Sequence, residues 1–140
     1  MEPLTVNGTL DSLGAIAQYV MTAAKEAELD KKSSYKLRLA VDEVATNIIT
    51  HGYEEAGLTG QISLTTLLDE NSLTIIVEDT GKAYDPQQSE AVEEDTITKP
   101  LEERKIGGLG LYLVMQGVDK FSYERLGDLN RHTFVMHRTQ

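Results

Sequence analysis

Three polar side chains near the middle of the chain have types and a spacing that could do chemistry. They are Glu43, Asn47 and His51, in the stretch LRLAVDEVATNIITHGY. Residues four apart share one face of a helix, so these three predict a polar stripe. An amide oxygen suits Mg²⁺, and a carboxylate one turn earlier could take a proton from a hydroxyl group or water. The alternative is that nearby backbone or water satisfies each group, with His51 bonding carbonyls at the helix end.

A second candidate is the aspartate that ends the apolar stretch SLTIIVED. In a strand, Asp79 points to the same side as Leu73, Ile75 and Val77. A carboxylate at the open end of an apolar strand can accept a hydrogen bond from an adenine amino group. Gly81 allows a turn or a close ligand approach. The tripeptide DTG alone more often marks a turn. It is also the triplet of aspartic proteases, but the long acidic segment that follows does not fit such an enzyme.

A third candidate is the stretch GGLGLYLV, in which Gly107, Gly108 and Gly110 precede an apolar helical pattern. It lacks the G-K-[ST] of a P-loop and the third glycine of a dinucleotide-binding turn. The N-terminus of a helix has free N–H groups that attract phosphate, so the glycines predict a phosphate site. An ordinary glycine turn is the alternative.

The elements that must position these residues follow from hydrophobic periodicity. We predict a strand at 4–9, a helix at 11–28 capped by Asp11, and a helix at 35–53 capped by Ser33 or Ser34. A hairpin of 61–68 and 72–79, a long acidic segment at 82–106, a helix from the glycines to about Asp119 and a last hairpin around DLN complete the chain. The core face of the second helix is predicted to hold Leu37, Val41, Val44, Ala45 and Ile48. This order predicts an α+β fold, a two-layer sandwich with a mixed, largely antiparallel sheet and helices on one face.

Bulk properties narrow the possible partners and compartment. The chain has 140 residues, the size of one domain, and a formal net charge of −10, which disfavours nucleic acid and anionic membranes. It has no cysteine, and its first residues lack the basic start and apolar run of a signal peptide. Together these features predict a single cytoplasmic domain, with no nucleic-acid or membrane partner.

Three motifs in a fixed order carry a family resemblance. E-x-x-x-N-x-x-x-H-G-Y, then D-x-G-x-x-x-D-P, then G-G-x-G-L resemble the GHKL ATPase superfamily, whose members have the Bergerat ATP-binding fold. The likeness is greatest to the single-domain anti-sigma factor serine kinases and spans roughly residues 4–138. It implies one ATP-binding domain over 1–140, with a lid over the nucleotide at about 87–106.

The resemblance also implies site residues and cofactors. Asn47 would ligate Mg²⁺, Glu43 would act as the catalytic base, and Asp79, beside Gly81, would read the adenine amino group. The remaining nucleotide-contacting positions that it implies are Arg104, Lys105, Gly108, Gly110 and Thr133. ATP and Mg²⁺ are the implied cofactors.

The function implied by the resemblance is that of an Mg²⁺-ATP-dependent protein serine/threonine kinase and anti-sigma factor. Such a protein phosphorylates an anti-sigma-factor antagonist, sequesters a sigma factor and forms a homodimer. Residues 11–28 contain no arginine, although kinases of this kind use one there to contact partners. The alternative is therefore a nucleotide-gated binding module of the same fold without phosphotransfer.

Overall fold

The computed structural model describes residues 1–83 and 116–138. Its elements, in chain order, are β1 (Leu4–Asn7), a 3₁₀ turn η1 (Leu10–Ser12), α1 (Leu13–Glu26), α2 (Lys31–Asn47), a π-helical segment η2 (Ile48–Glu54), β2 (Gln61–Leu68), β3 (Ser72–Asp79), β4 (Lys120–Leu126) and β5 (Leu129–His137). The predicted lid and glycine-rich stretch lie outside the described residues. The helix predicted to reach Asp119 does not do so, because residues 116–119 form a turn and bend that lead into β4.

The strands form one five-stranded sheet in the order β1-β2-β3-β5-β4. All four pairings between described strands are antiparallel, whereas a mixed, largely antiparallel sheet was predicted. Short hairpins join β2 to β3 and β4 to β5, and this connection produces antiparallel neighbours. The pairing of β3 with β5 sets Asp79 directly opposite Asn130.

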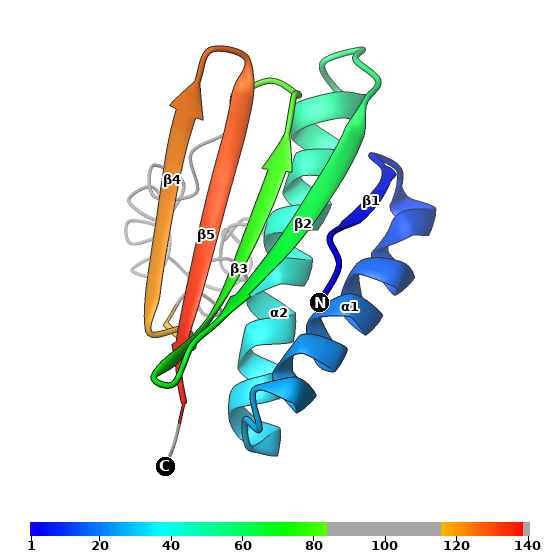
Figure 1. The fold of residues 1–140 in the computed structure, drawn as a ribbon. Helices are drawn as coiled ribbons and strands as arrows, with labels where there is room; N and C mark the ends of the chain where they lie inside the picture. The colour runs from blue at the N-terminus through cyan, green and yellow to red at the C-terminus, as the bar shows by residue number, and fades with distance from the viewer. Residues whose placement is uncertain (84–115, 139–140) are drawn as a thin grey trace, which may run out of the picture.

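Both long helices lie on the same side of the sheet, so the domain has two layers (Figure 1). The core lies between the layers, and all five residues predicted for the core face of the second helix are buried there, four on α2 and Ile48 at the start of η2. Residues of β3 alternate between the core and the open face, ending with Asp79 on the core side. The predicted α+β two-layer architecture is therefore confirmed.

Helix starts differ from the prediction. Asp30 caps α2, because its Oδ1 accepts a hydrogen bond of 2.7 Å from the backbone N–H of Ser33. The predicted caps, Ser33 and Ser34, lie inside the first turn instead. Asp11 was predicted to cap the first helix, but it lies within η1, and its carboxylate accepts a hydrogen bond from the Thr9 hydroxyl. A carboxylate serves better than a hydroxyl at the positive end of a helix, which favours Asp30.

The end of the second helix departs from α-helical geometry. Residues Ile48–Glu54 are π-helical, and the N–H of Glu55 donates to the carbonyl of Thr50, five residues earlier. A π segment carries more residues per turn, and such segments often occur at functional sites. The change of pitch takes His51 off the straight stripe predicted with Glu43 and Asn47. His51 also contacts the Glu55 carboxylate at 3.0 Å.

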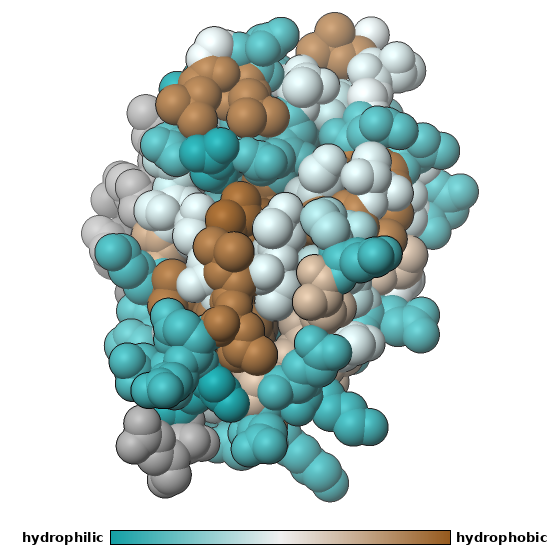
Figure 2. All heavy atoms as spheres, in the orientation of Figure 1, coloured by the Kyte–Doolittle hydropathy of each residue, from teal (hydrophilic) through white to brown (hydrophobic). Residues whose placement is uncertain are grey.

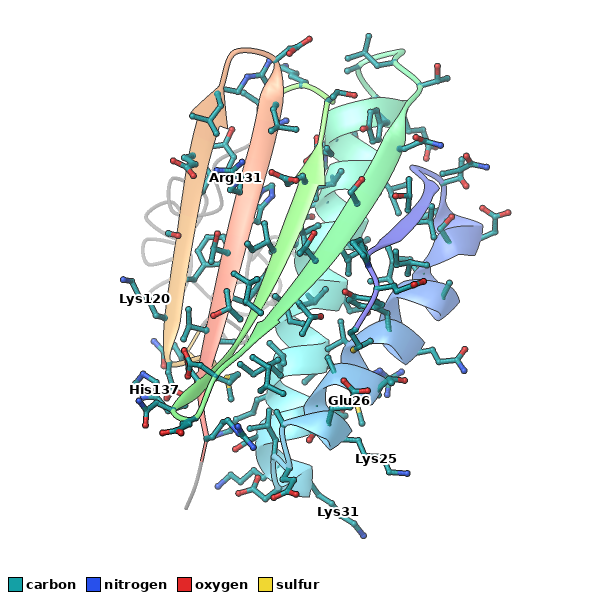
Figure 3. The ribbon with its side chains drawn as sticks, in the orientation of Figure 1. Lys25, Glu26, Lys31, Lys120, Arg131 and His137 are labelled. Carbon is teal, nitrogen blue, oxygen red and sulfur yellow. The ribbon has the colours of Figure 1, made fainter. Side chains whose placement is uncertain are left out.

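The open face of the sheet, which faces the viewer in Figure 2, has a central column of hydrophobic side chains among polar ones. On this face Arg131 forms ion pairs with Glu78 and Glu124, at 2.8 and 3.0 Å. These pairs join β3, β5 and β4, and Figure 3 shows Arg131 on β5. The open face is thus distinct from the core side to which Asp79 belongs.

Candidate nucleotide site

Asp79 is the buried acid at the end of β3, with 3% of its surface exposed. Its Oδ1 accepts hydrogen bonds of 2.9 Å from the N–H of Gly81 and from Nδ2 of Asn130. Its Oδ2 is buried with no hydrogen-bond partner among the described residues. An unpartnered buried acceptor is costly, so this oxygen suits a ligand that donates a hydrogen bond.

The electrostatics of Asp79 reflect the same arrangement. Burial raises the pKa of its carboxyl, and this effect is opposed by the hydrogen bonds from Asn130 and Gly81 and by the positive charge of Arg125. A pKa raised by desolvation means that the ionised carboxylate is energetically unfavourable in the folded protein. A ligand N–H that donates to Oδ2 would compensate part of that cost.

Gly81 brings the loop after β3 into close contact with the π segment. A Cβ at this position would lie 2.7 Å from the carbonyl oxygen of Gly52. The N–H of Lys82 donates to that same oxygen at 2.9 Å, and the N–H of Thr80 donates to the Tyr53 hydroxyl at 3.0 Å. The loop that follows Asp79 is thereby attached to the π segment, which continues the helix that carries Glu43 and Asn47.

Glu43 and Asn47 lie one turn apart near the end of α2. Asn47 is 9% exposed and Glu43 is half-buried. Among the described residues, no side chain hydrogen-bonds to either group. Burial, and to a smaller extent the negative charge of Asp42, raises the pKa of Glu43. A half-buried carboxylate with a raised pKa is a better proton acceptor than an exposed one.

The donor set fits a hard cation held with few protein ligands. Asn47 supplies a nearly buried amide oxygen, and Mg²⁺ is commonly bound by one or two protein oxygens together with phosphates and water. Within residues 1–83 and 116–138 no three His, Cys, Asp or Glu side chains group to form a protein-only metal cage. Asn47 is therefore suited to a shared metal–phosphate site rather than to a structural metal site.

Sequence reasoning missed Asn130, which is 1% exposed and anchors the Asp79 loop. The stretch DLN was interpreted as a turn, but the turn is at Gly127 and Asp128, and Asn130 belongs to β5. Gly127 has φ +66°, a conformation that favours glycine and ends the hairpin before Asn130. Only the strand register, which places Asn130 opposite Asp79, could have identified it.

Thr133 does not join this cluster. Residues of β5 alternate in burial, with Asn130, His132 and Phe134 on the core side. By this alternation Thr133 lies on the opposite, open face together with Arg131, so its predicted place at the adenine end is wrong. The buried position next to Asn130 on the core side is taken by His132, whose ring lies 5.0 Å from that of Tyr123. Arg104, Lys105, Gly108 and Gly110 lie outside the described residues.

Two cavities lined by described residues border this region. One, of about 360 Å³, is lined by His51, Glu55, Ala56, Lys82 and Ala83 and opens where η2 meets the segment after β3. The other, of about 620 Å³, lies around Tyr53 and the β1–η1 connection and is lined by none of the predicted site residues.

Known proteins of similar sequence indicate the family. A family model described as the histidine kinase-like ATPase domain matches residues 6–136. The chain belongs to the histidine kinase-like ATPase family. Its described helices are also too short or too polar to cross a membrane.

Relatives within the family differ in how much they share with this ATPase domain. The serine-protein kinase RsbW of Halalkalibacterium halodurans is 30% identical over 118 residues, which are 84% of this chain and 71% of that protein. The RsbW of Bacillus thuringiensis is 38% identical over 79 residues, 56% of this chain and 48% of that protein. The chain thus spans about half the length of the second relative.

Solved structures support the fold of the ATPase domain. The histidine kinase domain of the blue-light activated histidine kinase from Erythrobacter litoralis matches with a TM-score of 0.56 and 18% identity. The match covers 91% of this chain and 60% of that one. Histidine kinase AdeS of Acinetobacter baumannii matches with a TM-score of 0.51 and 11% identity, over 100% and 70% of the two chains. The predicted ATPase family and fold are confirmed.

Proposed function

We propose that this chain is an Mg²⁺-ATP-dependent protein serine kinase of the anti-sigma factor type. It would phosphorylate an antagonist protein and sequester a sigma factor in a partner switch. The observation that carries the nucleotide part is the buried Oδ2 of Asp79, which has no partner among the described residues. The RsbW names of the relatives support the kinase part.

The residues of α2 have separate roles in this proposal. Asn47 would hold Mg²⁺, which neutralises charge on the ATP phosphates when it is bound. Glu43, one turn earlier, would accept the proton of a substrate serine hydroxyl while the serine oxygen attacks the γ-phosphorus. The bond from the γ-phosphorus to ADP breaks, and ADP leaves with the electron pair. The raised pKa of Glu43 suits this role.

Asp79 and Gly81 would bind the base at the other end of the nucleotide. Gly81, Arg104, Lys105, Gly108 and Gly110 remain the proposed nucleotide contacts, and Thr133 is left out because it lies on the open face. A cytoplasmic homodimer is part of the same proposal. The acidic net charge of −10 suits protein partners with basic surfaces.

A label-transfer experiment separates the kinase from a nucleotide-gated binding module. The protein is incubated with an extract of the producing cells and γ-labelled ATP, and label on serine is measured. Glu43→Gln should reduce serine labelling by about 100-fold or more, the usual effect of losing a general base, while ATP binding persists. Glu26→Gln, the same change at an exposed position on α1 (Figure 3), should keep full labelling.

Each outcome points to one function. Unchanged serine labelling by the Glu43→Gln variant would refute the assignment of Glu43 as the catalytic base. A wild-type protein that binds ATP but labels no protein in the extract would support the binding module.

A further inference from the structure

The Asn130 side chain forms four hydrogen bonds with described residues around the proposed base site. Its Nδ2 donates to Oδ1 of Asp79 at 2.9 Å and to the carbonyl of Gly81 at 3.0 Å. Its Oδ1 accepts from the Tyr123 hydroxyl at 2.7 Å and from Nη1 of Arg125 at 2.9 Å. A primary amide has two donor hydrogens and two acceptor sites, so Asn130 is fully used.

These partners also decide which way the amide points. A flipped Asn130 would place its oxygen against two acceptors, the Asp79 carboxylate and the Gly81 carbonyl, and its NH₂ group against the Arg125 guanidinium. The observed orientation is therefore the favourable one. Arg125 further restrains the loop, because its Nη1 also donates to the Gly81 carbonyl at 3.0 Å.

As a result, the two carboxylate oxygens of Asp79 differ in their hydrogen bonding. Oδ1 receives two donors from the protein, whereas Oδ2 receives none among the described residues. A carboxylate held in this way offers a ligand one acceptor and no donor. It would attract an amino group and repel a carbonyl oxygen, and sites built to bond one polar group discriminate strongly against an analogue without it.

We infer that Asn130 is a positioning residue that makes the site select a 6-aminopurine over a 6-oxopurine, by holding Oδ1 of Asp79 so that only Oδ2 meets the base. Tyr123 and Arg125, on the edge strand β4, fix the orientation of the Asn130 amide by donating hydrogen bonds to its oxygen. The inference rests on the proposed nucleotide site and adds to it a residue that specifies the base.

A merely structural Asn130 would give a different result from a positioning one. Loss of structure would weaken binding of every nucleotide to the same extent. Loss of positioning frees the Asp79 carboxylate to rotate and removes a bond to its ionised form, so a 6-amino and a 6-oxo base become more alike. The ratio of two affinities therefore carries the test.

The experiment measures dissociation constants for ATP and for inosine triphosphate, which has an oxygen where ATP has the 6-amino group. Titration calorimetry on the whole chain with Mg²⁺ is suitable. We expect wild type to prefer ATP and Asn130→Ala to lower that preference about tenfold, the scale of one hydrogen bond. Thr133→Val, on the same strand but the opposite face, should leave the ratio unchanged.

Tyr123→Phe provides a second route if Asn130→Ala does not fold, since it keeps the aromatic ring and removes the 2.7 Å bond to the Asn130 oxygen. It should lower the preference severalfold, less than Asn130→Ala does. If these variants weaken the binding of ATP and of inosine triphosphate equally, or if wild type binds both equally well, the inference is overturned. The proposed ATP site is not affected by either result. A wild type that binds neither nucleotide overturns the site and the inference together.

Discussion

Asp79→Asn tests the nucleotide site most directly, because it changes the charge of one buried group and little else. The amide oxygen of the new side chain can still accept from Gly81 and Asn130, so the loop keeps its two hydrogen bonds. The Oδ2 atom, which has no partner in the described part of the chain, becomes an NH₂ donor, which opposes the adenine amino group. The substitution should therefore preserve the fold and abolish nucleotide binding.

The expected size of the effect follows from linkage. ATP with Mg²⁺ at 100 times its dissociation constant stabilises a protein by about 2.7 kcal/mol. For a domain of 140 residues this corresponds to a rise in Tm of about 9 °C. We expect that rise in wild type and no rise in Asp79→Asn. Without ATP the variant should be at least as stable as wild type, because it removes a charge whose burial is unfavourable.

Thermal unfolding with and without Mg²⁺-ATP measures both quantities. Glu78→Gln is the matched control, since Glu78 is the neighbouring acid on β3 but lies on the open face with Arg131. It should show the full rise. A rise in Asp79→Asn equal to that of wild type would refute the role of Asp79, and no rise in wild type would refute the nucleotide site itself.

Three further predictions concern stability. The folded-state pKa of Asp79 is raised above its ordinary value of 3.8, so its destabilising charge disappears as pH falls through the window between them. Any stability advantage of Asp79→Asn over wild type should thus shrink from pH 7 to pH 4 in urea titrations, and an advantage that grows would contradict the sign. Gly81→Ala should destabilise by more than about 1 kcal/mol because its Cβ meets the Gly52 carbonyl, whereas Gly14→Ala, in open space on α1, should stabilise by about 0.5–1 kcal/mol. Asp30→Ala removes the α2 cap and should cost about 1 kcal/mol in chemical unfolding, and an unchanged midpoint would show that the cap bond is unimportant.

Periodicity predicted the main elements well because burial on one face leaves a direct mark on a sequence. The core face of α2 and the two strands that flank the turn at Asp69 appear in the structure as predicted. The turn itself forms as expected, because the Asp69 carboxylate accepts from the backbone N–H groups of Asn71 and Ser72. Local chemistry of this kind needs no knowledge of distant residues.

The departures arise where distant segments meet. The π segment is in contact with the loop after β3, at Gly52 and Lys82, and no local pattern in IITHGYE indicates that change of pitch. Thr133 was predicted to lie at the adenine end from the family resemblance, but the alternation of side chains along β5 places it on the open face. Asn130 was assigned to a turn because Asp and Asn are common in turns.

By itself, then, the sequence determined the family and the two-layer fold, because motif order and hydrophobic periodicity can be read along the chain. It also supplied the acids and the amide that are proposed to face the ligand. Only the tertiary structure decided which partners those groups have. Pairing of β3 with β5 is a contact between residues about 50 positions apart. That register brings Asn130 to Asp79, and it leaves one buried carboxylate oxygen of Asp79 without a partner among the described residues.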